Sequence, residues 1–468
     1  FGFAHAMCLG AQNLSNRPFH ILIHELEHIA ACLAPDFAYG AGENVLRLVD
    51  KGYVVADFLH GFHIVGGEDD GGAIVTQSQN LTLEQICIDG VESRERLVEN
   101  QELGLMDDCA DELTNEPVMT AILEKDALAS QPTLSRFFNR MDEDTLKQLN
   151  QVTRELRKVI YSIKKPEFML FDIDSTLLDT YGKQEGEGFN YHYQAHGYHP
   201  LLCYDGLTGD LLKAELRDGT MYCSKDADDF MKSLLEEFTK DFPDMLLFLR
   251  GDSGFASPAL YEVLEEKKCK YTIRLKENAK LRELAEDRNQ ALYRATKFNQ
   301  VDYAVEYGEF LYQAGSWSHP RRVVFKIEKP YGQMIHLYTF LVTTMEMEPY
   351  QVIQFYCGRG KMENFIKESK SGFDFASVSS SSKIVNANRL LIHGLAYNLF
   401  NWFRRLALAA SMRKQRIDTI RLKLLKIAAR VVRSARYKYF KLCSSCPYKK
   451  EFYETLENIR NLQPQFVQ

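Results

Sequence analysis

The sequence predicts an α/β core that is interrupted by a β-rich insertion and flanked by helical N-terminal and C-terminal regions. Two short apolar runs, Phe168–Asp174 and Met245–Arg250, have the length and composition of buried strands. Helix-like and strand-like segments alternate around them, which is typical of α/β proteins. Residues 277–345 instead carry period-2 runs that favour antiparallel strands.

The elements follow in order along the chain. Beyond the two apolar runs, strands are predicted at residues 191–204, 211–216 and 270–275, and helices at residues 226–239 and 257–267. Within the insertion, the alternating runs cover residues 321–327 and 335–342. From Pro349 onward we expect helix to the end of the chain.

These patterns divide the chain into four regions. We predict a helical N-terminal region that is a candidate for DNA binding, a first part of the α/β core, the insertion, and a helical C-terminal region with a basic stretch, over residues 1–160, 161–276, 277–345 and 346–468. Residues 130–140 begin with a Ser130 cap and Pro132, which favours a helix start. Its polar residues could enter a DNA groove, or Phe137 and Phe138 could pack it into a core.

Charge is distributed unevenly along the 468 residues. The net charge of −7 argues against a simple nucleic-acid coat protein. Residues 41–130, however, contain 19 acidic and 5 basic residues, whereas residues 401–450 contain 15 basic residues against the single acid Asp418. The second stretch predicts a basic surface for a polyanion. The acidic stretch is unusual for DNA contact, so the role of residues 1–108 stays open.

Cysteine usage and hydropathy indicate the cellular compartment of the protein. Ten cysteines without framework spacing favour a reducing environment, and the lone pair Cys443 and Cys446 is a weak zinc signal. No signal peptide is visible, and the longest apolar stretch, residues 390–412, is too polar for a membrane span. We expect no membrane association. Because the sequence begins at Phe1, we expect a truncated or processed chain.

Two aspartates follow the predicted buried strands. Asp174 and Asp252 each lie just past an apolar run, where ligand sites collect in α/β sheets. Two neighbouring carboxylates repel each other unless a cation or a proton lies between them, and Mg²⁺, or Mn²⁺, prefers such oxygen ligands. The structural alternative is that each Asp caps a turn.

A third acid lies in a regularly spaced set downstream. Tyr356, Arg359, Glu363 and Lys370 are separated by 3, 4 and 7 residues, which places them on one stripe of a continuous helix. A carboxylate for a metal with cations for phosphates suits phosphodiester chemistry. The alternative is an exposed helix face with a salt bridge between Arg359 and Glu363.

A competing interpretation concerns Asp172. The run from Asp172 to Leu177 after an apolar strand also resembles the opening motif of haloacid-dehalogenase-type phosphatases, in which the first Asp attacks phosphorus. Asp252 could begin that family's later acidic motif, but no second acid follows it. This interpretation also leaves Tyr356–Lys370 and the basic C-terminal stretch unused.

Taken together, the motifs resemble the DDE transposases of bacterial insertion sequences, in the branch with a Tyr-x2-Arg-x3-Glu-x6-Lys signature. Tyr356–Lys370 fits that spacing throughout, Asp174 and Asp252 resemble the first two acids, and the resemblance covers roughly residues 109–462. It implies a ribonuclease-H-like core, metal-dependent cleavage at transposon ends and strand transfer into target DNA. It further implies a homodimer on double-stranded DNA and a bacterial, cytoplasmic, nucleoid-associated location.

The resemblance also implies residue roles. Asp174, Asp252 and Glu363 would be catalytic metal ligands, and a further set would contact DNA, namely Tyr356, Arg359, Lys370, Arg413, Lys414 and Arg416. Asp172 and Glu368 are weaker candidates for assisting the metal. Trp317 could stack on a base, although burial in the insertion is favoured. A catalytically inactive DNA-binding relic is the third hypothesis.

Overall fold

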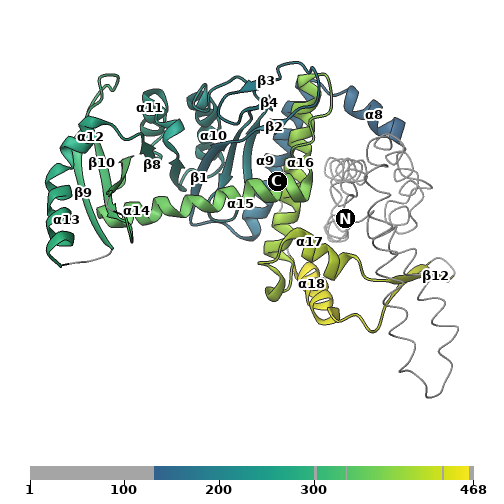
Figure 1. Ribbon diagram of the computed structural model, residues 1–468. Coiled ribbons are helices and arrows are strands. Elements are labelled where there is room, and N and C mark those ends of the chain that lie inside the picture. The colour runs from purple at the N-terminus through teal and green to yellow at the C-terminus, as the bar shows by residue number, and fades with distance from the viewer. Residues whose placement is uncertain (1–130, 300–302, 334, 435–436, 463–468) are drawn as a thin grey trace, which may run out of the picture. The chain divides into compact units, whose positions relative to one another are not determined.

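The computed structural model describes residues 131–299, 303–333, 335–434 and 437–462 (Figure 1). The chain divides into two compact units. The larger unit comprises residues 140–416 and 450–468, and the smaller unit comprises residues 1–139 and 417–449. Each unit is described by itself below.

The larger unit is built on a mixed eight-stranded sheet. Its strand order is β6-β5-β1-β7-β8-β11-β10-β9. The strands are β1 (Phe168–Ser175), β5 (Leu201–Asp205), β6 (Leu211–Glu215), β7 (Leu246–Gly251), β8 (Lys270–Leu275), β9 (Ala304–Tyr312), β10 (Arg321–Lys329) and β11 (Leu337–Thr343). Strand β1 runs parallel to β7, and β7 runs parallel to β8, whereas every other neighbouring pair is antiparallel. Every strand of this sheet except β9 falls on or next to a run predicted from the sequence.

Helices lie on both faces of this sheet (Figure 1). The larger unit contains α9 (Glu143–Ile163), α10 (Ala227–Asp241), α11 (Pro258–Glu266), α12 (Ala279–Leu284), α13 (Glu286–Asn299), α14 (Pro349–Cys357), α15 (Lys361–Phe373), α16 (Lys383–Leu406) and α18 (Lys449–Asn461). A small sheet of β2 (Leu178–Asp179), β4 (Ala195–Tyr198) and β3 (Gly188–Asn190) follows β1. Helix α9 starts at Asp142, whose carboxylate accepts from the Thr145 amide at 2.9 Å, a typical N-cap.

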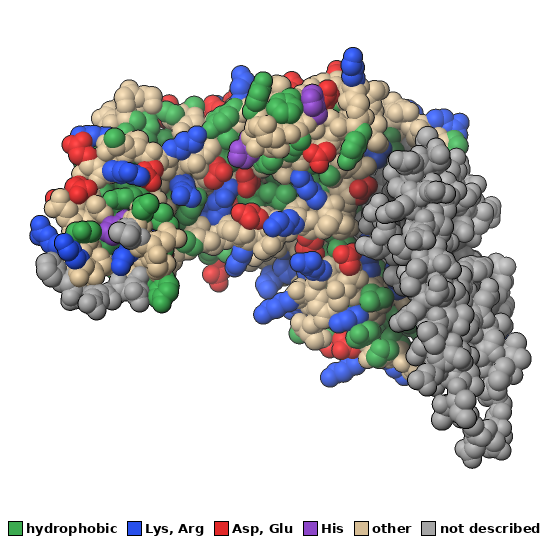
Figure 2. Space-filling view, viewed as in Figure 1, with side chains coloured by type: hydrophobic (Ala, Val, Ile, Leu, Met, Phe, Trp, Pro, Cys, Tyr) green, Lys and Arg blue, Asp and Glu red, His purple; other side chains and the backbone are tan. Residues whose placement is uncertain are grey.

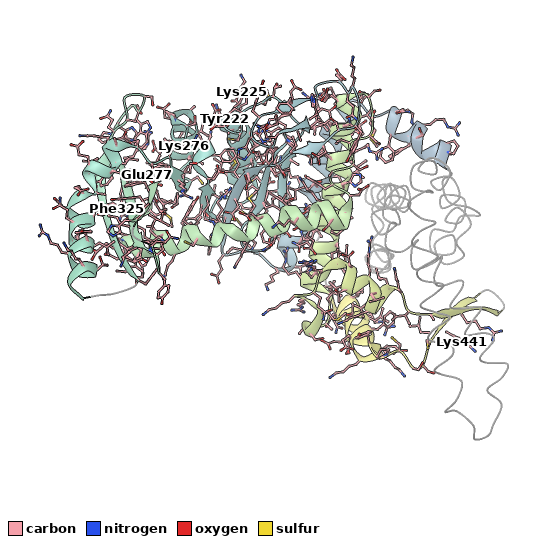
Figure 3. The ribbon with its side chains drawn as sticks, in the orientation of Figure 1. Tyr222, Lys225, Lys276, Glu277, Phe325 and Lys441 are labelled. Carbon is pink, nitrogen blue, oxygen red and sulfur yellow. The ribbon has the colours of Figure 1, made fainter. Side chains whose placement is uncertain are left out.

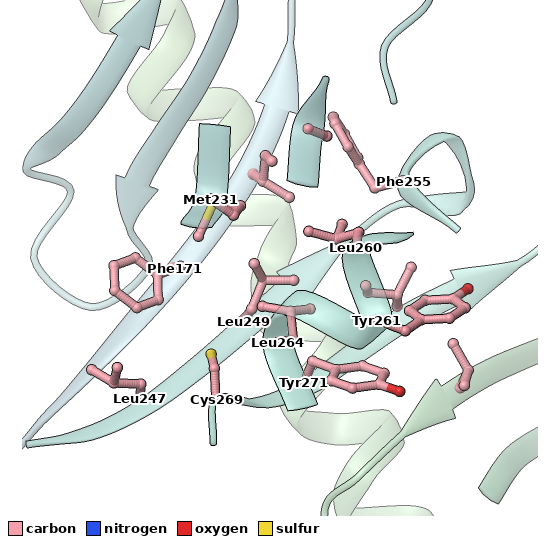
Figure 4. Packing of buried hydrophobic residues seen from close by; sticks show 14 of the residues in the cluster. Phe171, Met231, Leu247, Leu249, Phe255, Leu260, Tyr261, Leu264, Cys269 and Tyr271 are labelled. Carbon is pink, nitrogen blue, oxygen red and sulfur yellow. The ribbon is translucent and has the colours of Figure 1, made fainter. Parts of the chain in front are cut away.

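The main core lies between the sheet and helices α10 and α11. Figure 4 shows Leu249 of β7 beside Leu264 of α11, whereas Phe171 of β1 packs edge-on against Phe238 of α10, and these side chains are almost fully buried. Burying each such side chain contributes about 1.5–3 kcal/mol before entropy is counted. On the opposite face, Val352 of α14 belongs to a second buried cluster with residues of β10 and β11. Packing on both faces fixes the sheet as a central layer.

The insertion continues the main sheet instead of forming a separate β domain. Strands β9, β10 and β11 extend the sheet from β8, and they follow helices α12 and α13. The predicted strands at residues 321–327 and 335–342 correspond to β10 and β11. The sequence reasoning did not predict the helices, although Asn278 caps α12 by accepting from the Leu281 amide at 2.9 Å.

The smaller unit contradicts the expectation of helix to the end of the chain. Its described elements are α8 (Gln131–Asn139), α17 (Ile417–Ile420), a π-helical turn (Arg421–Leu425), β12 (Ala429–Ser434) and β13 (Tyr437–Leu442). The last two pair antiparallel. Their segments are rich in Val, Tyr and Phe, which favour strands, so the basic composition concealed a β pattern.

Several expectations concern residues outside the described ranges. Ser130 lies there, as do residues 1–108, whereas residues 131–139 are helical as predicted and Phe138 is buried. The boundaries proposed at residues 160, 276 and 345 stay predictions. Among the described helices, none combines the length and the apolar character needed to cross a bilayer.

Candidate active site

Asp174 and Asp252 lie at the same edge of the sheet. Asp174 is the next-to-last residue of β1, and Asp252 follows the last residue of β7. The two strands are parallel neighbours, with Asp172 in register with Arg250, so their carboxyl ends emerge side by side. The edge of parallel strand ends is where ligand sites form in α/β sheets. The tertiary structure therefore places the two acids where the sequence predicted.

Arg359 lies between the two carboxylates. Its Nη2 donates to Asp174 Oδ2 at 2.8 Å and is 3.9 Å from Asp252 Oδ2. The side chains of Arg359 and Asp174 are 13% and 18% exposed, whereas that of Asp252 is 42% exposed. Asp252 also caps the turn Ser253–Phe255, because its Oδ1 accepts from the Gly254 amide at 2.8 Å. Asp252 thus caps a turn with Oδ1, while its Oδ2 lies near Arg359, so the capping and site interpretations are compatible.

The carboxyl group of Asp174 lies in a mostly buried environment, with one cation and two further acids nearby. Burial raises the pKa of Asp174 to about 6, the guanidinium of Arg359 opposes this, and the charges of Asp252 and Glu363 raise the pKa further. A perturbed carboxyl at a strand-end edge is a common feature of functional sites. Burial is therefore the main cause of the raised pKa of Asp174, and its acidic neighbours add to it.

Glu363 lies in the first turn of α15 and is exposed. Its charge reaches Asp174, but within the described residues no group of three or more His, Cys, Asp or Glu side chains is arranged to hold a metal ion. The site therefore consists of two converging acids bridged by an arginine, with the third acid nearby.

The prediction of one continuous helix over Tyr356–Lys370 is wrong, because a short turn interrupts the helix. Helix α14 ends at Cys357, a 3-10 turn spans Gly358–Gly360, and α15 begins at Lys361. Gly358 is required there, since a Cβ at this position would lie 2.6 Å from Arg250 Nη1. The break turns Arg359 toward the two aspartates, so the salt bridge that competed with the site interpretation, Arg359 with Glu363, does not form.

Tyr356 and Lys370 support the site from either side of this turn. Tyr356 packs against the apolar cluster under α14, and burial raises the pKa of its phenol. Lys370 Nζ donates to the Leu177 carbonyl at 2.6 Å, and burial lowers the pKa of its ammonium. Lys370 thereby ties α15 to the segment after β1, in addition to any phosphate contact.

Two weaker candidates have structural roles. Both carboxylate oxygens of Asp172 accept from Arg250, at 2.7 and 2.6 Å, and Asp172 is fully buried. An attack by Asp172 on phosphorus, as the phosphatase interpretation requires, would break this pair. Glu368 pairs with Arg404 of α16, and both side chains are 17% exposed. Each acid is thus paired with its own arginine, Asp172 with Arg250 and Glu368 with Arg404.

Four further residues that were candidates for DNA contact lie away from Asp174 and Asp252. Arg413, Lys414 and Arg416 are exposed, and Arg413 Nε donates to the Leu408 carbonyl at 3.0 Å. Trp317 is only 7% exposed and packs edge-on against Tyr261, so burial is correct and base stacking is not available to it. In Figure 2 basic and acidic side chains are intermingled on the visible face of the larger unit.

Sequence reasoning missed three residues around the aspartates. The Tyr193 hydroxyl donates to the Ser175 carbonyl at 3.3 Å, next to Asp174. Cys223 packs so closely that a Cβ on Gly254 would lie 2.5 Å from its Sγ, and its neighbour Tyr222 is labelled in Figure 3. Arg274 of β8 is exposed near Tyr356, just before Lys276. No motif spacing marks these positions, because Tyr193 and Cys223 lie in turns and Arg274 lies on β8, outside the segments that carry the aspartates.

Comparison with known proteins identifies the family. Residues 103–464 match the family model described as transposase DDE domain group 1, so the chain belongs to this family of transposases. This match identifies the family and not the bacterial insertion-sequence branch within it. A search of the curated proteins found no match.

Solved structures give weaker similarities. The cryo-electron-microscopy structure of a piggyBac transposase synaptic complex with hairpin DNA is 14% identical, with a TM-score of 0.36, over 53% of this chain and 49% of that chain. The catalytic domain of Mos1 mariner transposase is 12% identical, with a TM-score of 0.18, over 34% and 72%. A Mos1 mariner paired-end complex with Mn is 12% identical, with a TM-score of 0.17, over 51% and 76%. The chain thus spans about half of the piggyBac transposase chain. Sequence identities and TM-scores this low do not support the transfer of residue roles from these structures.

Proposed function

We propose that this chain is a DDE-type transposase that cleaves DNA strands at transposon ends and joins them to target DNA. The observation that carries the proposal is the convergence of Asp174 and Asp252, from two parallel strands, on a single positive charge. Membership of the transposase family makes phosphodiester cleavage the chemistry to test at this pair. The strand order β6-β5-β1-β7-β8, with β5 antiparallel to its neighbours, supports a ribonuclease-H-like core.

The residues present fit a divalent cation. Asp174 and Asp252 converge on one cationic group, and the side chain of Asp252 is 42% exposed, which leaves this carboxylate accessible to an ion. Mg²⁺ or Mn²⁺ is suited to such carboxylate oxygens. Asp174 and Asp252 would hold the ion, and Glu363 would join them. When bound, a divalent ion supplies Lewis acidity toward a phosphodiester and lowers the pKa of bound water.

The protein's own groups would position the DNA. Arg359 can donate two parallel hydrogen bonds to a phosphate, and Lys370 adds a point charge to the same region. Tyr356, with its phenol kept neutral by burial, can donate one hydrogen bond to a phosphate oxygen. Exposed Arg413, Lys414 and Arg416 would contact the DNA backbone with strong salt dependence.

The proposed oligomeric state, DNA partner and cellular location follow from this reaction. Synapsis of two DNA ends requires two active sites, so we propose a homodimer on double-stranded DNA. A bacterial source would place the protein in the cytoplasm with the nucleoid. The inactive-relic alternative differs in one observable: a relic would retain salt-sensitive DNA binding and cleave nothing with any divalent ion.

The test is a nicking assay on a supercoiled plasmid that carries the sequences flanking the gene. We expect nicks only with Mg²⁺ or Mn²⁺, and we expect Asp252→Asn to abolish them. Glu262→Gln, an exposed position on α11, is the control for an unrelated acid. Nicking that persists in chelator, or in the Asp252→Asn protein, would refute the assignment.

A further inference from the structure

The guanidinium of Arg359 lies between the two proposed metal ligands. Arg359 Nη2 is 2.8 Å from Asp174 and 3.9 Å from Asp252. A divalent ion held by both carboxylates would occupy the space next to this guanidinium. Two like charges about 4 Å apart repel by about 4 kcal/mol per pair of unit charges at a partly buried site. This repulsion opposes the binding of Arg359 and the ion to the same two carboxylates at once.

Arg359 is also incompletely satisfied where it lies. Its Nε is buried without a hydrogen-bond partner, and it makes a single short contact to Asp174. The nearby Arg250 is the internal contrast, since it donates to both oxygens of Asp172 and to the Phe355 carbonyl. A phosphate offers an arginine the paired acceptors that Asp174 does not provide here.

The backbone next to Arg359 is tightly packed at Gly358 and open at Gly360. Arg359 is the middle residue of the short 3-10 turn Gly358–Gly360, between α14 and α15. A Cβ built on Gly360 would meet no atom within 4 Å. The described polar contacts of the guanidinium are the hydrogen bond to Asp174 and the longer ion pair with Asp252.

We infer that Arg359 competes with the divalent ion for Asp174 and Asp252, and that a DNA phosphate relieves this competition by binding the guanidinium. DNA and metal then bind with positive coupling, and by linkage each raises the affinity for the other by the same factor. The device would keep the metal site weak until a DNA strand is present. This inference rests on the proposed function, because it assumes a metal at the two aspartates.

The first experiment measures Mn²⁺ affinity without DNA, by electron paramagnetic resonance of the free ion. Arg359→Gln removes the charge and keeps polar volume, and we expect it to bind Mn²⁺ at least about fivefold more tightly than the unsubstituted protein. Lys361→Ala is the matched control, because it removes a neighbouring exposed cation that makes no described ion pair with either aspartate. We expect its Mn²⁺ affinity to change by less than about twofold.

The outcomes separate this inference from the proposed function. If Arg359→Gln and the unsubstituted protein bind Mn²⁺ equally, while Asp174→Asn/Asp252→Asn binds none, the competition is refuted and the metal site stands. If the double variant binds Mn²⁺ as well as the unsubstituted protein, the metal site itself is refuted. Circular dichroism melting checks folding, and Arg359→Ala replaces Arg359→Gln if the latter unfolds.

The second experiment adds a saturating DNA duplex of about 40 base pairs at low salt. The complex of the same duplex with the double variant is the blank for Mn²⁺ bound by DNA alone. We expect DNA to tighten Mn²⁺ binding at least about fivefold in the unsubstituted protein and less than about twofold in Arg359→Gln. An unchanged affinity in the unsubstituted protein would overturn the coupling.

Discussion

Arg250 donates two hydrogen bonds to Asp172 across the parallel strands β1 and β7, at 2.7 and 2.6 Å. Both residues are nearly inaccessible to solvent, and Arg250 also donates to the Phe355 carbonyl of α14 at 2.7 Å. One buried ion pair thus joins the two strands that carry Asp174 and Asp252 to the helix that precedes Arg359. Its integrity is a condition for the geometry of the site.

Asp172→Asn should therefore destabilise the fold severely. The substitution leaves the Arg250 guanidinium buried without its counter-charge, which costs about 3–5 kcal/mol of the free energy of unfolding. Urea denaturation followed by circular dichroism measures the loss. The double change Asp172→Leu/Arg250→Met, which removes both charges, should recover most of it. A single variant within about 1 kcal/mol of the unsubstituted protein would contradict the role.

Two glutamates on α15 should separate chemistry from stability. Glu363→Gln should lower the nicking rate by about 100-fold or more, since loss of several kcal/mol of transition-state stabilisation has that effect, and should leave the urea midpoint unchanged. Glu368→Gln should instead weaken the pair with Arg404 and lower the free energy of unfolding by about 1–3 kcal/mol. Parallel nicking and urea measurements on both proteins check this. Glu368→Gln nicking far more slowly at full stability would reverse the assignment.

The raised pKa of Asp174 should make the metal-free protein lose stability as the pH rises. Between about pH 4 and 6 the native state binds more protons than the unfolded chain, so the free energy of unfolding falls with pH across this window. The two-unit shift corresponds to about 3 kcal/mol at most. Burial also raises the pKa of Asp205 to about 6, so the comparison with Asp174→Asn isolates one group. Urea curves from pH 4 to 7 that run parallel in both proteins would disprove the prediction.

Trp317 should matter for folding and not for DNA binding. It is buried between Tyr261 and Tyr312, with the Arg321 guanidinium 5.5 Å from its ring centroid. Trp317→Ala should cost about 3–5 kcal/mol of the free energy of unfolding, and Trp317→Phe clearly less. Fluorescence anisotropy with labelled duplex should give unchanged DNA affinity for the folded protein. Weaker DNA binding at unchanged stability would restore the stacking role.

Local pattern was enough to predict most of the core. The apolar runs before Asp174 and Asp252 became β1 and β7, and the helix predicted at residues 257–267 became α11. These elements were predictable because burial on both faces demands unbroken apolar residues over a strand's length. The hairpin of β12 and β13 was missed since fifteen basic residues within residues 401–450 hid its alternation.

The site was predictable only in part. Spacing selected Arg359 and Glu363 together, but the glycines at 358 and 360 interrupt the helix, so Arg359 turns to Asp174 while Glu363 stays exposed. Tyr193 and Arg274 carried no signal, because a turn between β3 and β4 carries the first, whose hydroxyl reaches Ser175, and the pairing of β8 with β7 places the second.

By itself the sequence determined which segments form the sheet, the identity of the acids at its strand ends, and the family resemblance. Only the tertiary structure decided that Asp172 pairs with Arg250, that Glu368 pairs with Arg404, and that Arg359 lies between Asp174 and Asp252. The physical reason is that strand and helix propensities depend on neighbours along the chain. The partner of a charged side chain instead depends on which distant segment the packed core brings within a few ångströms.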